Sequence, residues 1–268
     1  MMYSKYLPTL INIALAAGAK ISEIYATDFD CETKEDGSSV TQADKLGEEI
    51  ILRGLKELAP DIPVLAEEAA CAGNIPDLGE TFFLVDPLDG TREFVNRTGE
   101  FTVNIALIHQ TKPVLGVVYA PGCCKLYYGA VGEGAWLRMV SPGTNLHDAT
   151  PGKTIEVRKR PYKGLIAVAS RSHCSPETTS YLTKIGAAKY TPAGSSLKFC
   201  LIAEGLADVY PRLGRTMEWD TGAGQAILEA AGGRVLVLAD GKETGHLCYC
   251  KQDRDYDNPH FVAWGGPA

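Results

Sequence analysis

The sequence predicts a mixed fold, of the α+β and α/β classes, because the two halves of the chain differ in pattern. Residues 102–137 alternate β-rich runs with Pro and Gly breaks, which is typical of antiparallel strands in a meander. Residues 165–238 alternate apolar strands with helical runs, as an α/β unit does. We therefore expect an N-terminal α+β subdomain carrying a metal site, residues 1–150, and a C-terminal α/β subdomain, residues 151–268, joined within the Pro-, Gly- and Lys-rich stretch 141–163.

Two long helices are predicted before the meander. Apolar residues recur at helical spacing from Leu7 to Tyr25, and this pattern with a weakly basic start favours a core helix over a cleaved signal peptide. We expect no membrane span, because no apolar run reaches the required length. A second helix is expected from Asp44 to Leu58, after a polar turn. Further helices are predicted at 176–186, 195–205 and 219–233.

Continuous apolar runs predict the strands. "IPVLAEEAA" is interpreted as a short strand that ends in Glu67 and Glu68. "TFFLV" is interpreted as a buried strand that stops at Asp86 and Pro87. The following "TREFVNR", residues 91–97, is expected to form a short helix. Later strands are predicted at 165–170, 208–213 and 234–238.

The composition is that of a globular protein with ample material for a core. Of 268 residues, 45% are hydrophobic and 22% are charged, with a formal net charge of −7. This charge argues against a nucleic-acid polymer as partner, because binding its backbone needs clustered Lys and Arg. The eight cysteines show no CxxC pair, so we expect reduced thiols in a cytoplasmic setting.

The stretch "LVDPLDGTREF" places Asp86 and Asp89 three positions apart at the end of an apolar run. Like charges crowded together disfavour ionisation unless a cation lies between them. Gly90 and Thr91 follow at the expected start of a helix, where N–H groups favour anions. The stretch is therefore suited to a hard cation such as Mg²⁺ and to a phosphate, although a solvated turn is the alternative.

Two further acidic positions support the metal interpretation. Glu67 and Glu68 end the preceding apolar run, although such a pair is also common at a solvated strand end. Asp220 follows Trp219 before a Gly- and Ala-rich helical run that allows close approach of a helix N-terminus. The order of these clusters along the chain favours a shared site.

The segments "PVLAEE", "LVDPLDGTREF" and "EWDTGAGQAILEAAGG" together resemble the inositol monophosphatase and fructose-bisphosphatase superfamily of Mg²⁺-dependent, lithium-sensitive phosphatases. The similarity spans most of residues 34–233. It implies a layered αβαβα sandwich and a phosphatase that Li⁺ inhibits.

The resemblance also implies a set of metal ligands. One Mg²⁺ would be held by Glu67, Asp86 and the main-chain carbonyl of Leu88. The second would be held by Asp86, Asp89 and Asp220. A third, weaker ion near Glu67 is seen in relatives.

Catalytic roles follow from the same resemblance. In the superfamily a metal-bound water is the nucleophile, oriented by the residues that match Thr91 and Asp44 here, and no covalent enzyme intermediate forms. By residue type Asp44 also suits a helix N-cap, and both roles can coexist. Lys34 and Asp36 match a mobile loop that covers the site in relatives, although Asp-Gly with serines is also an ordinary flexible turn.

"GEFTVNIALI", "KPVLGVVYAP", "SRSH" and "GSSLKFCLIAEG" most resemble the bisphosphate nucleotidases of this superfamily. This implies hydrolysis of the 3′-phosphate of 3′-phosphoadenosine 5′-phosphate (PAP) to AMP and phosphate, a reaction of sulfur metabolism. The positions that match nucleotide contacts are Ser170, Ser172, His173, Gly194, Ser195 and Lys198. The metal-site residues implied to touch the substrate as well are Glu67, Leu88, Asp89, Gly90, Thr91 and Asp220.

A lysine makes physical sense beside a substrate with two phosphates, because the phosphate that is not cleaved needs a cation. The alternatives are a solvated helix face for Lys198 and a surface position beside a helix cap for His173. Inositol-selective relatives carry an acidic residue several positions before the Trp-Asp pair, whereas the nearest candidate here, Glu218, is adjacent to Trp219.

Three other functions are alternatives for such a sequence. An inositol phosphatase or broad sugar-phosphate phosphatase of the same fold is the nearest alternative. Covalent aspartyl phosphatases need a DxD spacing that "DPLD" lacks, and a non-catalytic homologue would be expected to lose at least one ligand. The resemblance further implies a cytoplasmic enzyme, peripheral to the inner membrane in close relatives, with 3′-phosphoadenylyl sulfate as another substrate to test and a homodimer among the open oligomeric states.

Overall fold

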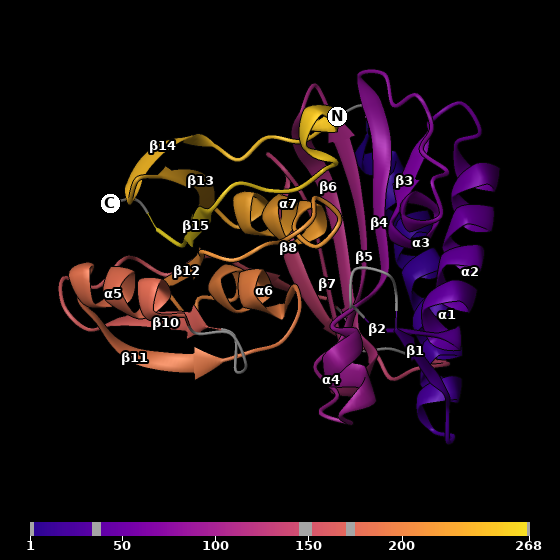
Figure 1. Cartoon of the computed structure of the whole chain (residues 1–268), viewed down its shortest axis with the longest axis horizontal. Helices are drawn as coiled ribbons and strands as arrows, with labels where there is room; N and C mark the ends of the chain where they lie inside the picture. The colour runs from indigo at the N-terminus through magenta and orange to yellow at the C-terminus, as the bar shows by residue number, and fades with distance from the viewer. Residues whose placement is uncertain (1–2, 34–38, 145–151, 170–174, 267–268) are drawn as a thin grey trace.

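The computed structural model of the chain describes residues 3–33, 39–144, 152–169 and 175–266. Most strands belong to two sheets (Figure 1). The first sheet has seven strands in the order β3 (Val64–Ala66), β4 (Thr81–Asp89), β5 (Thr102–His109), β6 (Lys112–Ala120), β7 (Lys125–Ala130), β8 (Gly134–Met139) and β9 (Lys153–Ile155). The second has six in the order β11 (Ala187–Pro192), β10 (Leu165–Ala169), β12 (Val209–Arg212), β15 (Phe261–Trp264), β13 (Arg234–Ala239) and β14 (Lys242–His246).

The described helices and a small hairpin complete the fold. The hairpin pairs β1 (Cys31–Thr33) with β2 (Ser39–Thr41). The α-helices are α1 (Leu7–Tyr25), α2 (Gln42–Leu58), α3 (Glu67–Cys71), α4 (Thr91–Val95), α5 (Pro176–Lys184), α6 (Leu197–Ala203) and α7 (Gly222–Ala230). Short 3₁₀ turns occur at Ser4–Tyr6, Pro121–Cys123 and Gln252–Arg254.

The layers form the predicted αβαβα sandwich. In Figure 1, α1 and α2 cover the outer face of the first sheet, and α6 and α7 lie between the two sheets. The helix α5 packs on the other face of the second sheet, where Leu182 meets Leu165 and Val209. The two sheets therefore enclose the inner helices, and the central apolar core includes Phe199 of α6 and Ile227 of α7.

The strand β4 of the first sheet is apolar on both faces for a simple reason. Successive side chains point to opposite faces of a strand. In β4, Phe83 and Val85 pack under α1 and α2, while Phe82 and Leu84 face the inner helices. Because both faces are covered, the run "TFFLV" shows no polar alternation. The antiparallel meander predicted over 102–137 is confirmed as β5 to β8.

The N-terminal helix α1 is confirmed and packs as a core helix. Its buried residues Leu10, Ala14, Ala17 and Ile21 lie in the apolar layer against the first sheet. By length and apolar composition alone, the helical stretch Ser4–Tyr25 also meets the minimum for a membrane-crossing helix. Its amphipathic burial gives it a packing role on this sheet.

Close approach between layers needs a glycine in β6. A Cβ on Gly116 would lie 2.3 Å from the carbonyl oxygen of Ala223 and 2.9 Å from Cβ of Ala226. Both partners belong to α7. The small residues of "DTGAGQAILEA" therefore allow this helix to press against the sheet, which brings its N-terminus to the strand ends.

Several elements differ from the sequence predictions. The strand predicted to stop at Asp86 and Pro87 continues as β4 to Asp89, with a break in register between Asp86 and Asp89. This irregularity accommodates Pro87, which has no N–H to donate to the ladder. The strands β1, β2, β9, β11, β14 and β15 were not predicted. The strand β9 follows residue 150 yet pairs with β8, so the division of the chain at residue 150 remains a prediction.

Candidate active site

Three carboxylates meet where β4 ends and α7 begins. Asp86 and Asp89 come from β4, and Asp220 comes two residues before α7. Each of the three offers an oxygen, and these oxygens all lie within 4.8 Å of one another. Asp220, which lies 131 positions after Asp89 in the chain, is therefore gathered with the two aspartates of β4 into one acidic cluster.

The local chain conformation after β4 presents both aspartates. The backbone N–H of Leu88 donates to Oδ1 of Asp86 at 2.9 Å, which leaves the other oxygen of Asp86 free of this bond. Gly90 has a φ of 90°, in the left-handed region that favours glycine, and it directly precedes α4. This turn also allows Gly90 to lie close to Ser195, whose Cβ would be 3.3 Å from a Cβ on Gly90.

Burial and crowding raise the pKa values of Asp86 and Asp220. The pKa of Asp86 lies well above its usual range, first because the group is buried and then because Glu67, Asp89 and Asp220 are near. The pKa of Asp220 is also well above its usual range, through burial and then Asp89 and Glu67. The charged forms therefore need a cation to offset desolvation and mutual repulsion.

The donor set fits a hard divalent cation. Carboxylate and amide oxygens are the ligands that Mg²⁺ takes in proteins. In addition to the three aspartates, Oδ1 of Asn104 is buried and has no hydrogen-bond partner among the described residues. Asn104 pairs with Asp86 across β4 and β5, so this unpaired oxygen belongs to the same region.

Glu67 and Leu88 contribute in a different way from the three aspartates. Glu67 is the first residue of α3, directly after β3, and it is outside the 4.8 Å group. It is still close enough for its charge to raise the pKa values of Asp86 and Asp220. The carbonyl oxygen of Leu88 accepts a hydrogen bond from Oγ1 of Thr91 at 3.3 Å.

Thr91 and Asp44 are brought together, although 47 residues separate them. The Thr91 hydroxyl donates to Oδ1 of Asp44 at 3.2 Å. The other oxygen of Asp44 accepts from the backbone N–H and the hydroxyl of Thr41, both at 2.7 Å. Asp44 is 2% exposed, and burial raises its pKa.

The alternative role of Asp44 as an N-cap needs correction. Thr41 is the N-cap of α2, and Asp44 is the third helical residue of a capping box. The helix therefore begins at Gln42 rather than at Asp44. One oxygen of Asp44 serves the cap and the other contacts Thr91, so a structural contact and a site contact coexist.

The segment "GSSLK" lies directly against the acidic cluster. The Ser195 hydroxyl donates to Oδ2 of Asp89 at 2.8 Å and is also hydrogen bonded to the Thr102 hydroxyl. The Ser196 hydroxyl donates to the main-chain oxygen of Asp220 at 2.8 Å. The neighbouring Gly194 donates its N–H to Oε2 of Glu100 at 3.0 Å. The predicted nucleotide-contacting segment thus also holds two residues of the cluster in place.

Lys198 is buried beside the cluster, so the alternative of a solvated helix face is wrong. Its side chain lies in the first turn of α6 and is 8% exposed, with Nζ 5.5 Å from the ring centre of Tyr210. Burial lowers its pKa, whereas the charges of Asp89, Glu93 and Asp220 favour the protonated amine.

Arg212 was missed by the sequence analysis. It ends β12, and its charge lowers the pKa values of Lys198 and Asp220, which places it near both. Its Nε is buried without a hydrogen-bond partner among the described residues, although Nη2 donates to the oxygen of Arg215 at 2.6 Å. The available signal was an arginine at the carboxyl end of a predicted strand, where ligand crevices of α/β sheets form.

Five predicted site residues lie outside the part of the chain that the structure describes. They are Lys34, Asp36, Ser170, Ser172 and His173.

The fold and this acidic site define a class of protein. A family model described as the inositol monophosphatase family matches residues 2–263, and the chain belongs to this family of phosphatases, as the sequence motifs predicted. Among relatives, it is 47% identical over 231 residues to 3′(2′),5′-bisphosphate nucleotidase CysQ of Salmonella typhimurium, covering 85% of this chain and 89% of that protein.

Solved structures agree with this assignment. The crystal structure of CysQ from Bacteroides thetaiotaomicron is 38% identical, with a TM-score of 0.82 over 100% of this chain and 99% of that one. An inositol monophosphatase from Anabaena is 25% identical, with a TM-score of 0.71 over 99% and 92% of the two chains. The resemblance to the bisphosphate nucleotidases is therefore confirmed.

Proposed function

We propose that the protein is a Mg²⁺-dependent phosphomonoesterase that hydrolyses the 3′-phosphate of PAP to give AMP and phosphate. The observation that carries the proposal is the convergence of Asp86, Asp89 and Asp220 beside a buried lysine, Lys198. Such a site combines ligands for a divalent cation with a positive charge for a second phosphate. The names of the similar nucleotidases support the substrate class.

Glu67, Asp86 and the carbonyl of Leu88 would hold one Mg²⁺, and Asp86, Asp89 and Asp220 the second, with a third, weaker ion near Glu67. When bound, the ions would polarise the phosphate and lower the pKa of water. The raised pKa values of Asp86 and Asp220 support this arrangement, because both groups lack an adequate positive charge without it.

Thr91 and Asp44 would orient and deprotonate the attacking water. Since the Thr91 hydroxyl donates to Oδ1 of Asp44, the lone pairs of Oγ1 are directed away from that bond and can accept a hydrogen bond from water. A proton that passes to Oγ1 can move on to the carboxylate of Asp44. The capping box fixes the carboxylate through its other oxygen, so the acceptor is already oriented.

Lys198 and Arg212 would bind the phosphate that is not cleaved. Both cations lie near the acidic cluster, because Arg212 lowers the pKa values of Lys198 and Asp220, and Asp220 raises the pKa of Lys198. The two phosphates of the substrate are anions, and the chain as a whole has a net charge of −7. Binding them therefore needs cations placed at the site. Ser170, Ser172 and His173 are proposed to contact the nucleotide, with Gly90, Gly194 and Ser195 near the phosphate, and Lys34 and Asp36 to belong to a loop over the site.

The nearest alternative is an inositol-phosphate phosphatase of the same fold. The likeness to the Anabaena inositol monophosphatase is compatible with it. However, the acidic residue nearest to the Trp-Asp pair on its N-terminal side, Glu218, is 0% exposed and forms an ion pair with Lys251 at 2.6 Å. Its carboxylate is therefore unavailable to sugar hydroxyls, which favours the nucleotide.

The cellular setting is a proposal as well. The described cysteines are all free, and we propose a reducing, cytoplasmic location with a small nucleotide as the ligand. Cell fractionation will show whether the protein attaches peripherally to the inner membrane. Sedimentation will distinguish a homodimer from a monomer.

A substrate comparison tests the proposed function. Turnover of PAP, 3′-phosphoadenylyl sulfate and inositol 1-phosphate should be measured at equal concentration with Mg²⁺, each with and without Li⁺. We expect PAP to be hydrolysed fastest and Li⁺ to inhibit. Faster hydrolysis of inositol 1-phosphate would reject the proposal in favour of the alternative.

Replacing Lys198 with methionine should weaken binding of PAP selectively. Methionine preserves the apolar stem against Tyr210 but removes the charge. Because a hydrogen bond to a charged group contributes about 1.5–3 kcal/mol, we expect KM for PAP to rise roughly tenfold to a hundredfold at saturating Mg²⁺. Steady-state kinetics with 3′-AMP, which lacks the 5′-phosphate, provide the control. An equal loss with both nucleotides would assign Lys198 to the reaction centre instead.

A further inference from the structure

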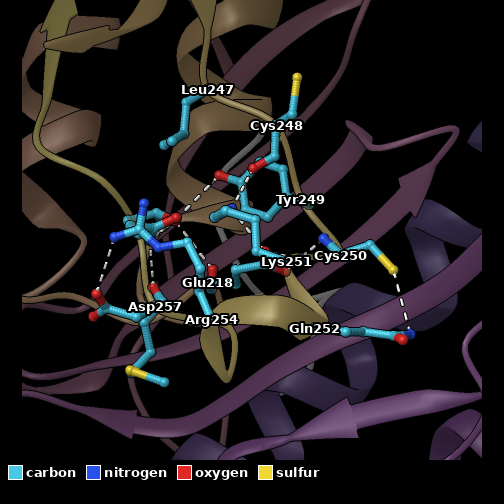
Figure 2. Close-up of polar contacts among 12 residues, drawn as sticks. Glu218, Leu247, Cys248, Tyr249, Cys250, Lys251, Gln252, Arg254 and Asp257 are labelled. Atoms are coloured by element: carbon cyan, nitrogen blue, oxygen red, sulfur yellow. Dashed lines mark hydrogen bonds and ion pairs between the residues drawn. The ribbon is translucent and has the colours of Figure 1, made fainter. Parts of the chain in front are cut away.

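The segment that carries Asp220 is held by a part of the chain with no predicted function. We define the C-terminal clamp as residues 247–258, which include "KQDRDYDN". Figure 2 shows Lys251, Cys250 and Tyr249 of the clamp gathered around Glu218. Glu218 is two residues before Asp220, so the clamp acts on the segment that supplies a proposed metal ligand.

The carboxylate of Glu218 is fully engaged by the clamp. Its Oε2 accepts the backbone N–H of Cys250 at 2.8 Å. Its Oε1 accepts the backbone N–H of Lys251 at 2.8 Å and Nζ of the same residue at 2.6 Å. The Lys251 ammonium also donates to the carbonyl oxygen of Cys248. Since Glu218 is completely buried, its charge depends on these donors.

Main-chain bonds connect the same two segments. The N–H of Glu218 donates to the oxygen of Tyr256 at 2.9 Å. Asn258 donates from its backbone N–H to the oxygen of Thr216 and from Nδ2 to the oxygen of Met217, both at 2.8 Å. Residues on the N-terminal side of Asp220 are therefore fixed both by side chains and by backbone.

The chain on the other side of Asp220 is fixed as well. The carbonyl oxygen of Glu218 accepts the N–H groups of Thr221 and Gly222, which lead into α7. The Thr221 hydroxyl accepts from the Tyr249 hydroxyl and from Nδ2 of Asn258, both at 3.1 Å. Only a short connection, Trp219 and Asp220, separates these anchored positions.

The orientation of the Asp220 carboxylate depends on this anchored segment. Its Oδ2 accepts the backbone N–H of Met217 at 2.9 Å, so the position of Met217 determines where the carboxylate points. Met217 is in turn held by Asn258 and is the residue directly before Glu218 in the chain. A protein binds its metal ion more weakly when the groups that orient a metal ligand are removed.

We propose that Glu218 and Lys251 are positioning residues for Asp220, so that the clamp sets the geometry of a ligand at the metal site. This inference rests on the proposed function, because it assumes that Asp220 binds Mg²⁺. An apolar pair of similar volume would hold the two segments together equally well. The ion pair additionally fixes the orientation of the Glu218 side chain. We infer that this in turn fixes the position of Met217 and of the Asp220 carboxylate that Met217 contacts.

The test measures Mg²⁺ binding directly, by calorimetric titration of Mg²⁺ into EDTA-treated full-length protein. We expect Lys251→Met to raise the Mg²⁺ dissociation constant by about tenfold or more, as for other groups that orient metal ligands. Glu218→Gln, which keeps the side-chain volume, should have a similar effect and provides a second route if Lys251→Met does not fold. Lys251→Arg retains the charge and should restore most of the affinity.

A matched control comes from a second buried carboxylate. Asp208 is 3% exposed and accepts from Nε of Arg158 at 2.7 Å and from the N–H of Ile166 at 2.6 Å. Arg158→Met breaks this pair, which is at the far end of β12 from Arg212. It should lower Tm as Lys251→Met does, while the Mg²⁺ dissociation constant stays at the wild-type value.

The wild-type titration separates the two proposals. If wild-type protein binds Mg²⁺ and Lys251→Met binds it equally well, the positioning role is overturned and the proposed function is not. An equal weakening by Lys251→Met and Arg158→Met also overturns it, because the effect would then follow general stability. Absence of Mg²⁺ binding by the wild type would overturn the metal site itself, and this inference with it.

Discussion

Replacing Asp89 with asparagine is expected to reduce turnover of PAP by at least about 100-fold, without lowering the stability of the metal-free protein. The loss follows because Asp89 is a proposed ligand, and even groups that only orient a ligand are worth about 10- to 100-fold. Stability is retained because Asp89 raises the pKa values of Asp86 and Asp220 by repulsion, which the variant removes. Asparagine keeps an oxygen that can accept from the Ser195 hydroxyl.

The measurement combines steady-state kinetics with thermal unfolding in EDTA. Asp240→Asn is the matched control, since Asp240 is exposed in the turn after β13 and its φ of 51° is one that asparagine tolerates. The control should keep full turnover and an unchanged Tm. Full activity of Asp89→Asn would reject the assignment of Asp89 as a ligand.

Removal of metal is expected to make stability fall as pH rises. In the metal-free fold the pKa values of Asp86 and Asp220 are raised above their usual value of 3.8. Between that value and the raised pKa values, the folded state binds more protons than the unfolded state. The free energy of unfolding then decreases with increasing pH, by up to about 1.4 kcal/mol per pH unit for each group that titrates. This contribution is fully present below pH 3.8 and is lost as pH rises through the folded pKa values.

Thermal unfolding from pH 5 to pH 8, with EDTA or with Mg²⁺, measures this effect. We expect Mg²⁺ to raise Tm more at pH 8 than at pH 5, because a bound cation removes the cost of ionising the cluster. Asp220→Asn in EDTA should show a flatter dependence of Tm on pH than the wild type, since one titrating group is gone. A stabilisation by Mg²⁺ that does not change with pH would contradict the crowding of the three carboxylates.

Local pattern was sufficient for most helices and for the meander, but not for several strands of the second sheet, including its interior strand β15. The helix α1 was predicted because its apolar residues recur at helical spacing. The strands β5 to β8 were predicted because their β-rich runs are separated by Pro and Gly breaks. The strands β14 and β11 escaped prediction because they are exposed edge strands with little apolar alternation. The extension of β4 to Asp89 also escaped, because Pro87 normally ends a strand and only a break in register accommodates it.

The candidate site shows the same division. Asp86, Asp89, Glu67 and Asp220 could be selected as candidate metal ligands because carboxylates at the ends of apolar runs are conspicuous in a sequence. Arg212 and the clamp were not identified, because their roles depend on which segments pack together. Lys198 was identified by resemblance, but its burial could be known only from the packing of α6 against Tyr210.

The sequence by itself determined the mixed α and β character of the chain and the acidic residues proposed for its site, because these follow from local periodicity and from carboxylates at the ends of apolar runs. The class of the protein and the layered architecture followed from the resemblance of its motifs to a known family. Only the tertiary structure decided how Asp220 is held, through Glu218 and Lys251, and that the serines of "GSSLK" contact the acidic cluster. The physical reason is that hydrogen bonds and burial between distant segments depend on how layers pack, which no local pattern encodes. The motif "DPLDGT" therefore indicated a metal site, while the fold supplied the residues that orient the carboxylates of that site.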